Sequence, residues 1–112
     1  RAKRQIVLDG LAGCPVLRLI EPQGAFYAFV DVRLTGLDSG EFADRLLDEE
    51  HVAVVPGEAF GEEGRGFVRL SYAGDAGELR EGVARLRAFA ERVWNPITGH
   101  HTATYHPMEV LA

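Results

Sequence analysis

Arg69 is the side chain of this sequence whose type and position point most directly to chemistry. It lies in the run Phe-Val-Arg-Leu-Ser-Tyr, residues 67–72, whose alternation predicts a strand with Arg69 on the face opposite to Val68 and Leu70. A long cation there either faces solvent or binds an anion. If it binds an anion, the planar guanidinium favours a carboxylate, which it holds through two parallel hydrogen bonds. The sequence therefore offers a candidate carboxylate-binding residue, with a solvated arginine as the alternative.

Two other patterns contain residue types that bind a metal ion or a phosphate, but their spacing does not fit either kind of site. His100, His101 and His106 are of a type that binds metals, but a zinc site needs rigid spacing and a fourth ligand, and no cysteine lies near them. The glycine-rich run 61–66 places two acids where a phosphate would lie, and no helix is predicted after it. We therefore predict no metal site and no phosphate-binding loop. His51 is expected to be a surface residue at the end of a helix.

The composition is that of one water-soluble globular domain. The 112 residues are 46% hydrophobic and 26% charged, which allows a single core. A net charge of −5 repels phosphate backbones, so nucleic-acid binding is not expected, and no apolar run reaches the ~20 residues of a membrane helix. The one cysteine, Cys14, excludes an internal disulfide and fits a reducing compartment. We expect Cys14 to be packed and the protein to be cytoplasmic.

The first third of the chain predicts a helix followed by a β-hairpin. Residues 1–11 place Val7 and Leu11 on one stripe, although no capping residue precedes them, as if the chain began inside a helix. Runs 16–20 and 25–32 predict two strands, and the sequence Glu-Pro-Gln-Gly between them predicts the turn. These strands are expected to pair as an antiparallel hairpin.

The middle of the chain predicts a short helix that ends at residue 50. Asp38 and Glu41 have the spacing of a capping box, in which the first residue accepts a hydrogen bond from the backbone of the fourth. The expected apolar face of this helix comprises Phe42, Leu46 and Leu47.

The remaining elements complete the prediction of an α+β fold. Residues 52–55 and 67–72 predict strands, and residues from about 78 to 93 predict a helix. The expected buried face of this helix comprises Leu79, Val83, Leu86, Ala90 and Val93. The helices should cover one face of a small, mostly antiparallel sheet. Residues 95–112 have no convincing period and are expected to form an irregular tail after a domain of residues 1–94.

Three short stretches, taken together, resemble a known family. They read Glu-Pro-Gln-Gly-Ala-Phe-Tyr-Ala-Phe at 21–29, Val-Ala-Val-Val-Pro-Gly-Glu-Ala-Phe-Gly at 52–61 and Gly-Phe-Val-Arg-Leu-Ser-Tyr-Ala at 66–73. In this order and spacing they resemble the C-terminal small domain of fold type I, pyridoxal-phosphate-dependent aminotransferases of class I/II, the aspartate aminotransferase-like enzymes. The resemblance covers the predicted domain and does not extend into the tail.

The resemblance implies roles for residues that contact a substrate. The family's arginine in this strand clamps the α-carboxylate of the amino acid, and that position is Arg69 here. The Gly-Ala-Phe-Tyr element resembles a wall of the active site, which puts Gly24 and Phe26 near the substrate. Tyr27 is then expected to point the other way, into packing.

The resemblance also implies that the cofactor lies outside this sequence. In the family, pyridoxal phosphate is held as a Schiff base by a lysine of the large domain, with an aspartate on the pyridine nitrogen. Lys3 is the only lysine here and lies outside any such motif, and no aspartate matches the pyridine partner. We therefore expect no catalytic and no cofactor-binding residue in this chain, and no transamination by it alone. The whole protein is expected to be a homodimer that moves an amino group between an amino acid and a 2-oxo acid, although carbon–sulfur lyases share this domain.

Two readings from other classes stay open beside the aminotransferase. One is a stand-alone regulatory module that binds a small carboxylate or amino acid, and the other is a pure interaction domain. A domain cut from a larger enzyme should leave an apolar face bare. We expect that face to be the stripe of Val7 and Leu11 or the outer face of the hairpin.

Overall fold

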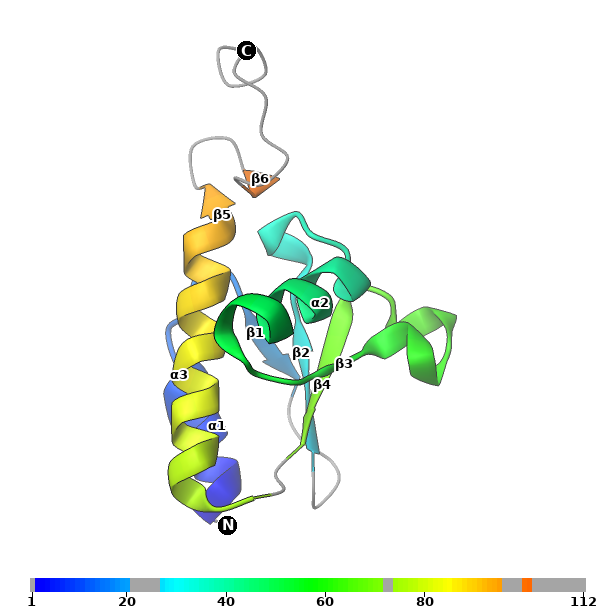
Figure 1. Cartoon of the computed structure of the whole chain (residues 1–112). Helices are drawn as coiled ribbons and strands as arrows, with labels where there is room; N and C mark the ends of the chain where they lie inside the picture. The colour runs from blue at the N-terminus through cyan, green and yellow to red at the C-terminus, as the bar shows by residue number, and fades with distance from the viewer. Residues whose placement is uncertain (1, 21–26, 72–73, 96–99, 102–112) are drawn as a thin grey trace.

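The structure, a computed structural model, describes residues 2–20, 27–71, 74–95 and 100–101 of the chain. The elements follow one another as α1 (Ala2–Leu11), β1 (Arg18–Ile20), β2 (Tyr27–Asp31), the 3₁₀-helix η1 (Arg33–Thr35), α2 (Ser39–Glu50), β3 (Val55–Pro56), the 3₁₀-helices η2 (Gly57–Phe60) and η3 (Glu62–Gly64), β4 (Phe67–Ser71), α3 (Ala76–Val93), β5 (Trp94–Asn95) and β6 (His100–His101) (Figure 1). The order of helices and strands through α3 is the one predicted.

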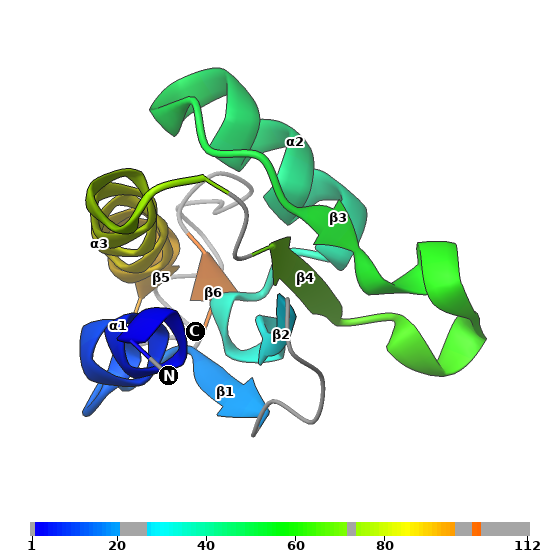
Figure 2. The same ribbon diagram turned by 90° about the horizontal axis from the view of Figure 1, so that it is seen from below.

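The main sheet has the strand order β1-β2-β4-β3, with every neighbouring pair antiparallel. In Figure 2 the helices α1, α3 and α2 lie on one side of these strands. The predicted hairpin is present as the pair β1–β2, and the chain then leaves the sheet through α2 before β3 and β4 are added. The α+β prediction, with helices on one face of an antiparallel sheet, is confirmed.

The core lies between the sheet and the helices. Strand alternation sends Ala28 and Val30 of β2, and Val68 and Leu70 of β4, toward the helix layer, where all four are buried. The helices contribute buried side chains to the same cluster, among them Val7, Leu11, Phe42, Leu46, Leu79, Val83, Leu86, Phe89, Ala90 and Val93. The predicted buried face of α3 is therefore confirmed.

Local hydrogen bonds fix where the helices begin and end. Asp38 accepts from the backbone N–H of Glu41 at 2.9 Å, as the capping-box spacing predicts. Asp75 does the same for Glu78 at 2.8 Å, so α3 begins before the predicted residue 78. His51 ends α2 in the left-handed conformation, with φ of 60°, and is exposed as predicted.

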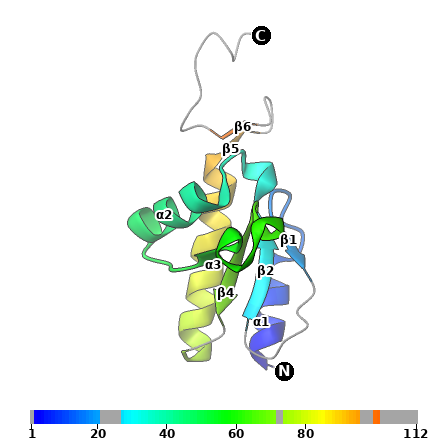
Figure 3. The ribbon, with the colours of Figure 1, turned by 90° about the vertical axis from the view of Figure 1, so that its right-hand side faces the viewer.

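Helices α1 and α3 lie side by side along the length of the sheet (Figures 1 and 3). A β-carbon on Gly10 would lie 2.4 Å from Cγ1 of Val83, so glycine is what allows this close approach. Arg87 of α3 donates to the carbonyl oxygens of Gly10 and Ala12, at 3.3 and 2.9 Å, where α1 ends. The expectation that Val7 and Leu11 would lie bare is therefore wrong, because α3 covers both.

Two further expectations differ from the structure. Leu47 is 53% exposed, because the buried stripe of α2 runs through Phe42 and Leu46 and not through their neighbour. The predicted strand at 52–55 is reduced to Val55–Pro56, where β3 pairs with β4.

Cys14 packs against the core as expected. No helix among the described residues is both long and apolar enough to cross a membrane.

At the boundary between the predicted domain and the predicted tail, β5 and β6 form a separate antiparallel pair, in which Trp94 lies opposite His101. Residues 96–99 and 102–112 are outside the described part, so His106 is not placed. No group of three or more His, Cys, Asp or Glu side chains in the described part is arranged to hold a metal ion.

Candidate functional site

The face of the sheet turned away from the helices carries the candidate site, and we call it the outer sheet face. Its central row crosses all four strands as Ile20, Phe29, Arg69 and Val55, each directly opposite the next. Arg69 alternates with buried Val68 and Leu70, which is why its side chain lies on this face, as predicted. A row on one side holds Tyr27 and Ser71, and a row on the other holds Arg18, Asp31 and Phe67.

The Arg69 guanidinium lies against two aromatic rings. Its Cζ is 4.1 Å from the centroid of the Phe60 ring and 5.0 Å from that of Tyr27. Aromatic rings attract a guanidinium through their electron-rich faces and stack on its planar surface. Because the N–H groups of a guanidinium lie in its plane, a ring against the flat face of a guanidinium leaves the donating edges available for hydrogen bonds.

No carboxylate among the described residues pairs with Arg69, which is partly buried. Among the described residues, six other arginines form an ion pair with an acid: Arg33, Arg45, Arg65, Arg85, Arg87 and Arg92. A guanidinium held by rings and without an acid of its own is suited to an external anion, and a carboxylate fits its two parallel donors.

The outer sheet face is unusually apolar for an exposed surface. Of the six large apolar side chains exposed in the described part, four gather around Arg69: Ile20 (40%), Tyr27 (38%), Val55 (37%) and Phe60 (49%). A hollow of about 250 Å³ lies among Ile20, Phe29, Phe60 and Phe67. The alternative that the outer face of the hairpin lies bare therefore agrees with the structure, and such a patch marks a place where ligands or other protein surfaces bind.

Tyr27 corrects one expectation about this face. It was expected to point into packing, but it shares the outer sheet face with Arg69 and its ring meets that of Phe29 edge-on, with centroids 5.8 Å apart. The reason is strand alternation, since Ala28 is the neighbour that enters the core. Gly24 and Phe26, the other two candidate site residues, lie outside the described residues.

Phe60 is the contact that the sequence analysis missed. It belongs to η2, between β3 and β4, and no periodicity marks it as a neighbour of Arg69. The turn at Gly57 brings it over the sheet, where its ring also meets Phe29 edge-on at 6.3 Å between centroids. Only its place in the stretch 52–61 that carries the resemblance could have drawn attention to it.

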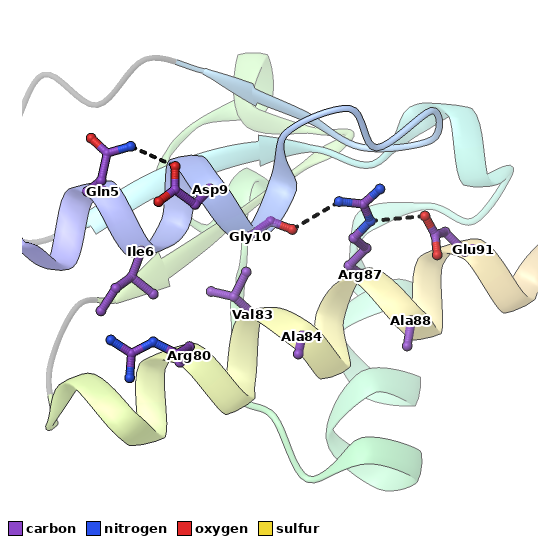
Figure 4. A pocket seen from close by; sticks show the side chains of 10 residues that line it. All are labelled: Gln5, Ile6, Asp9, Gly10, Arg80, Val83, Ala84, Arg87, Ala88 and Glu91. Atoms are coloured by element: carbon purple, nitrogen blue, oxygen red, sulfur yellow. Dashed lines mark hydrogen bonds and ion pairs between the residues drawn. The ribbon is translucent and has the colours of Figure 1, made fainter.

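A larger hollow, of about 680 Å³, lies on the opposite side of the molecule, between α1 and α3 (Figure 4). Its sides carry ordinary helix-surface pairs, such as Gln5 with Asp9 and Arg87 with Glu91. Ile6 and Val83 are the large apolar side chains among the residues that line it. It contains no predicted site residue, so its size does not make it the candidate site.

Lys3 and Arg69 lie on opposite sides of the sheet. Lys3, the one lysine, is on α1 in the helix layer, and its Nζ donates to the carbonyl oxygen of Gly74 at 2.6 Å. Arg69 lies on the other face of the sheet, so the amine and the guanidinium do not meet around a common ligand.

Arg33 and Asp31 form an ion pair at one end of the outer sheet face. Arg33 donates to the Asp31 carboxylate from Nε at 3.0 Å and from Nη2 at 2.8 Å, and its Cζ lies 5.1 Å from the centroid of the Phe67 ring. Burial raises the pKa of Asp31, but the hydrogen bonds and charge of Arg33 outweigh it, so the pKa lies below its usual value.

Asp31→Asn is expected to destabilise the chain at neutral pH and to become harmless in acid. Because the folded-state pKa of Asp31 is lowered, its stabilisation is complete above the unfolded value of about 3.9 and is lost as the pH falls through the folded value. Urea unfolding of both proteins at pH 7 and near pH 2 measures the difference. An equal difference at the two pH values would show that the carboxylate charge is not the cause.

Comparison with known proteins identifies the family of this chain. The chain belongs to the family of class I and II aminotransferases, whose family model matches residues 1–86. It is 40% identical over 89 residues to an aspartate aminotransferase of Pyrococcus horikoshii, covering 80% of this chain and 23% of that protein. It is 44% identical over 86 residues to an arginine–pyruvate transaminase of Pseudomonas aeruginosa, covering 77% of this chain and 22% of that protein.

Solved structures agree with this membership. The crystal structure of an aromatic aminotransferase from Pyrococcus horikoshii matches with a TM-score of 0.73 and 42% identity, covering 80% of this chain and 24% of that chain. The resemblance drawn from the three sequence stretches is thus confirmed as to the family. This chain spans less than a quarter of the length of these relatives.

Proposed function

We propose that this chain is the substrate-carboxylate-binding domain of an enzyme that transfers an amino group between an amino acid and a 2-oxo acid. The observation that carries the proposal is the Arg69 guanidinium, which lies over the Phe60 ring and has no carboxylate partner among the described residues. Membership of the aminotransferase family supports the reaction class.

Arg69 is the residue to which we assign recognition. Two parallel hydrogen bonds to an α-carboxylate fix both the position and the orientation of an amino acid, and orientation is a large part of what such enzymes gain in rate. The adjacent aromatic surface excludes water on one side and strengthens the charged contact. We extend the proposal to Gly24 and Phe26 as neighbours of the bound substrate.

The cofactor of the proposed enzyme is pyridoxal phosphate, held by a large domain outside this chain. It supplies the electron sink that makes amino transfer feasible, whereas this chain binds and orients the substrate. We further propose that the whole protein is a cytoplasmic homodimer. The exposed apolar side chains around Arg69 support a contact with further protein at this face.

The test compares the 112-residue chain with the whole protein. With pyridoxal phosphate, an amino acid and a 2-oxo acid, the whole protein should form the new amino acid and the chain alone should not. Borohydride treatment should leave Lys3 without stoichiometric labelling, because its amine is held by the Gly74 carbonyl in the helix layer, away from Arg69.

Two outcomes would contradict this proposal. Amino transfer by the chain alone, together with site-specific labelling of Lys3, would place the cofactor on this domain. Binding of small carboxylates by a whole protein that forms no new amino acid would favour the regulatory module.

A further inference from the structure

We propose that Phe60 is a positioning residue that holds the Arg69 guanidinium in the orientation needed for a carboxylate, and that Glu58 and Ser39 anchor the segment carrying it. This inference rests on the proposed function of Arg69. It adds residues from η2 and α2, elements that do not themselves belong to the sheet carrying the arginine.

The geometry at Arg69 gives Phe60 the closer of the two ring contacts. The Cζ lies 4.1 Å from the Phe60 centroid and 5.0 Å from that of Tyr27. An arginine side chain has considerable rotational freedom, which an unrestrained residue loses when it binds a ligand. A ring against the guanidinium plane restricts that freedom beforehand and leaves the N–H edges open. The substrate then binds an arginine that is already oriented.

Phe60 does not act as a core residue. Its side chain is 49% exposed and does not belong to the buried cluster. In the described part of the chain, its ring contacts Arg69 and Phe29, both on the outer sheet face. A side chain so placed contributes little to the stability of the domain, so its effect should be seen in substrate binding.

The segment that carries Phe60 is tightly built. A β-carbon on Gly57 would lie 2.1 Å from the carbonyl oxygen of Gly64, so η2 and η3 come together where only glycine fits. This contact closes the chain around Phe60 and limits where its ring can lie.

Ser39 and Glu58 tie this segment to the start of α2. The Ser39 hydroxyl donates to the Glu58 carboxylate and accepts from the backbone N–H of Gly66 at 3.1 Å. Ser39 is fully buried, so its hydrogen bond from Gly66 is shielded from water, and its hydrogen bond to Glu58 is partly buried. The link therefore connects the first residue of α2 to η2 and to the chain just before β4.

The first experiment replaces Phe60 in the whole protein. Phe60→Leu should raise KM for every amino-acid substrate about 3- to 10-fold, the range of a partly exposed cation–ring contact. The value of kcat should change less than about 2-fold, because the carboxylate is bound in both ground state and transition state. Phe60→Tyr keeps a ring and should retain the wild-type KM. Leu47→Ala, at an equally exposed apolar site on α2, is the control and should leave KM unchanged.

The second experiment breaks the anchor. Glu58→Ala removes the acceptor for Ser39 and should raise KM in the same direction as Phe60→Leu, whereas Glu58→Gln keeps an acceptor oxygen and should not. A purely structural role for Glu58 would alter thermal stability without this separation of KM between the two variants.

The two proposals fail separately. If Arg69→Lys raises KM but Phe60→Leu does not, or if Phe60→Tyr raises it as much as Phe60→Leu, Phe60 does not position the arginine. If Arg69→Lys itself leaves KM unchanged, the function assigned to Arg69 is wrong.

Discussion

Arg69→Lys in the whole protein is expected to lower kcat/KM for every amino-acid substrate about 30- to 1000-fold. Lysine keeps the positive charge, but its ammonium cannot make two parallel hydrogen bonds or stack on Phe60 as a plane. Loss of a charge-assisted, partly buried contact corresponds to about 2–4 kcal/mol of transition-state stabilisation. Unlike Phe60→Leu, this change should also lower kcat, since a loosely held substrate presents its amino group poorly. Steady-state kinetics on several amino acids measure it.

Amine substrates without an α-carboxylate provide the internal control for Arg69→Lys. Their turnover should change little, because they make no contact with the guanidinium, and binding of the cofactor should also be unaffected. Unchanged kinetics on amino acids would mean that Arg69 is a solvated residue, the alternative that its sequence environment leaves open.

Phe89→Ala is expected to reduce the free energy of unfolding of this chain by about 3–5 kcal/mol. Phe89 is fully buried on α3 and its ring meets that of Phe42 edge-on, with centroids 5.2 Å apart. The Cζ atoms of Arg45 and Arg92 also lie over it, at 5.4 and 5.2 Å from its centroid. Removing the ring leaves a cavity between α2 and α3 beneath the salt bridge of Arg92 with Glu49. Urea denaturation measures the loss, which is a large part of the ~5–15 kcal/mol typical of a domain.

Phe60→Ala is the matched comparison for Phe89→Ala. Its ring is half exposed, so its removal should cost less than about 1 kcal/mol of stability. One phenylalanine then governs folding and the other substrate binding. A loss below about 1 kcal/mol for Phe89→Ala would show that α2 and α3 repack around the vacancy.

Patterns that are local in sequence predicted most of the fold. The alternation of Val68, Arg69 and Leu70 set both the strand and the face on which each side chain lies. The spacing of Asp38 and Glu41 predicts the start of α2. The same spacing at Asp75 and Glu78 marks the start of α3, which lies before the predicted residue 78. These features depend on bonds within one turn of the chain, which is why sequence reveals them.

Features that depend on distant segments were not predictable in the same way. The burial of Val7 follows from the packing of α1 on α3, which requires glycine at position 10 opposite Val83. The contact between Phe60 and Arg69 arises from how η2 folds over the sheet, and no repeat in the sequence encodes it. For Tyr27, strand alternation gave the better guide than the resemblance, since its neighbour Ala28 is the one that is buried.

The edges of the sheet have a consequence for aggregation. Both edge strands are short, since β1 has three residues and β3 two, and β3 ends in Pro56, which has no backbone N–H to donate. A sheet grows between molecules by adding strands to long, unpaired edges, and short or proline-bearing edges block that route to aggregation. The domain thus combines an exposed apolar face, which includes Ile20 and Phe60, with short edges that disfavour the addition of strands from another chain.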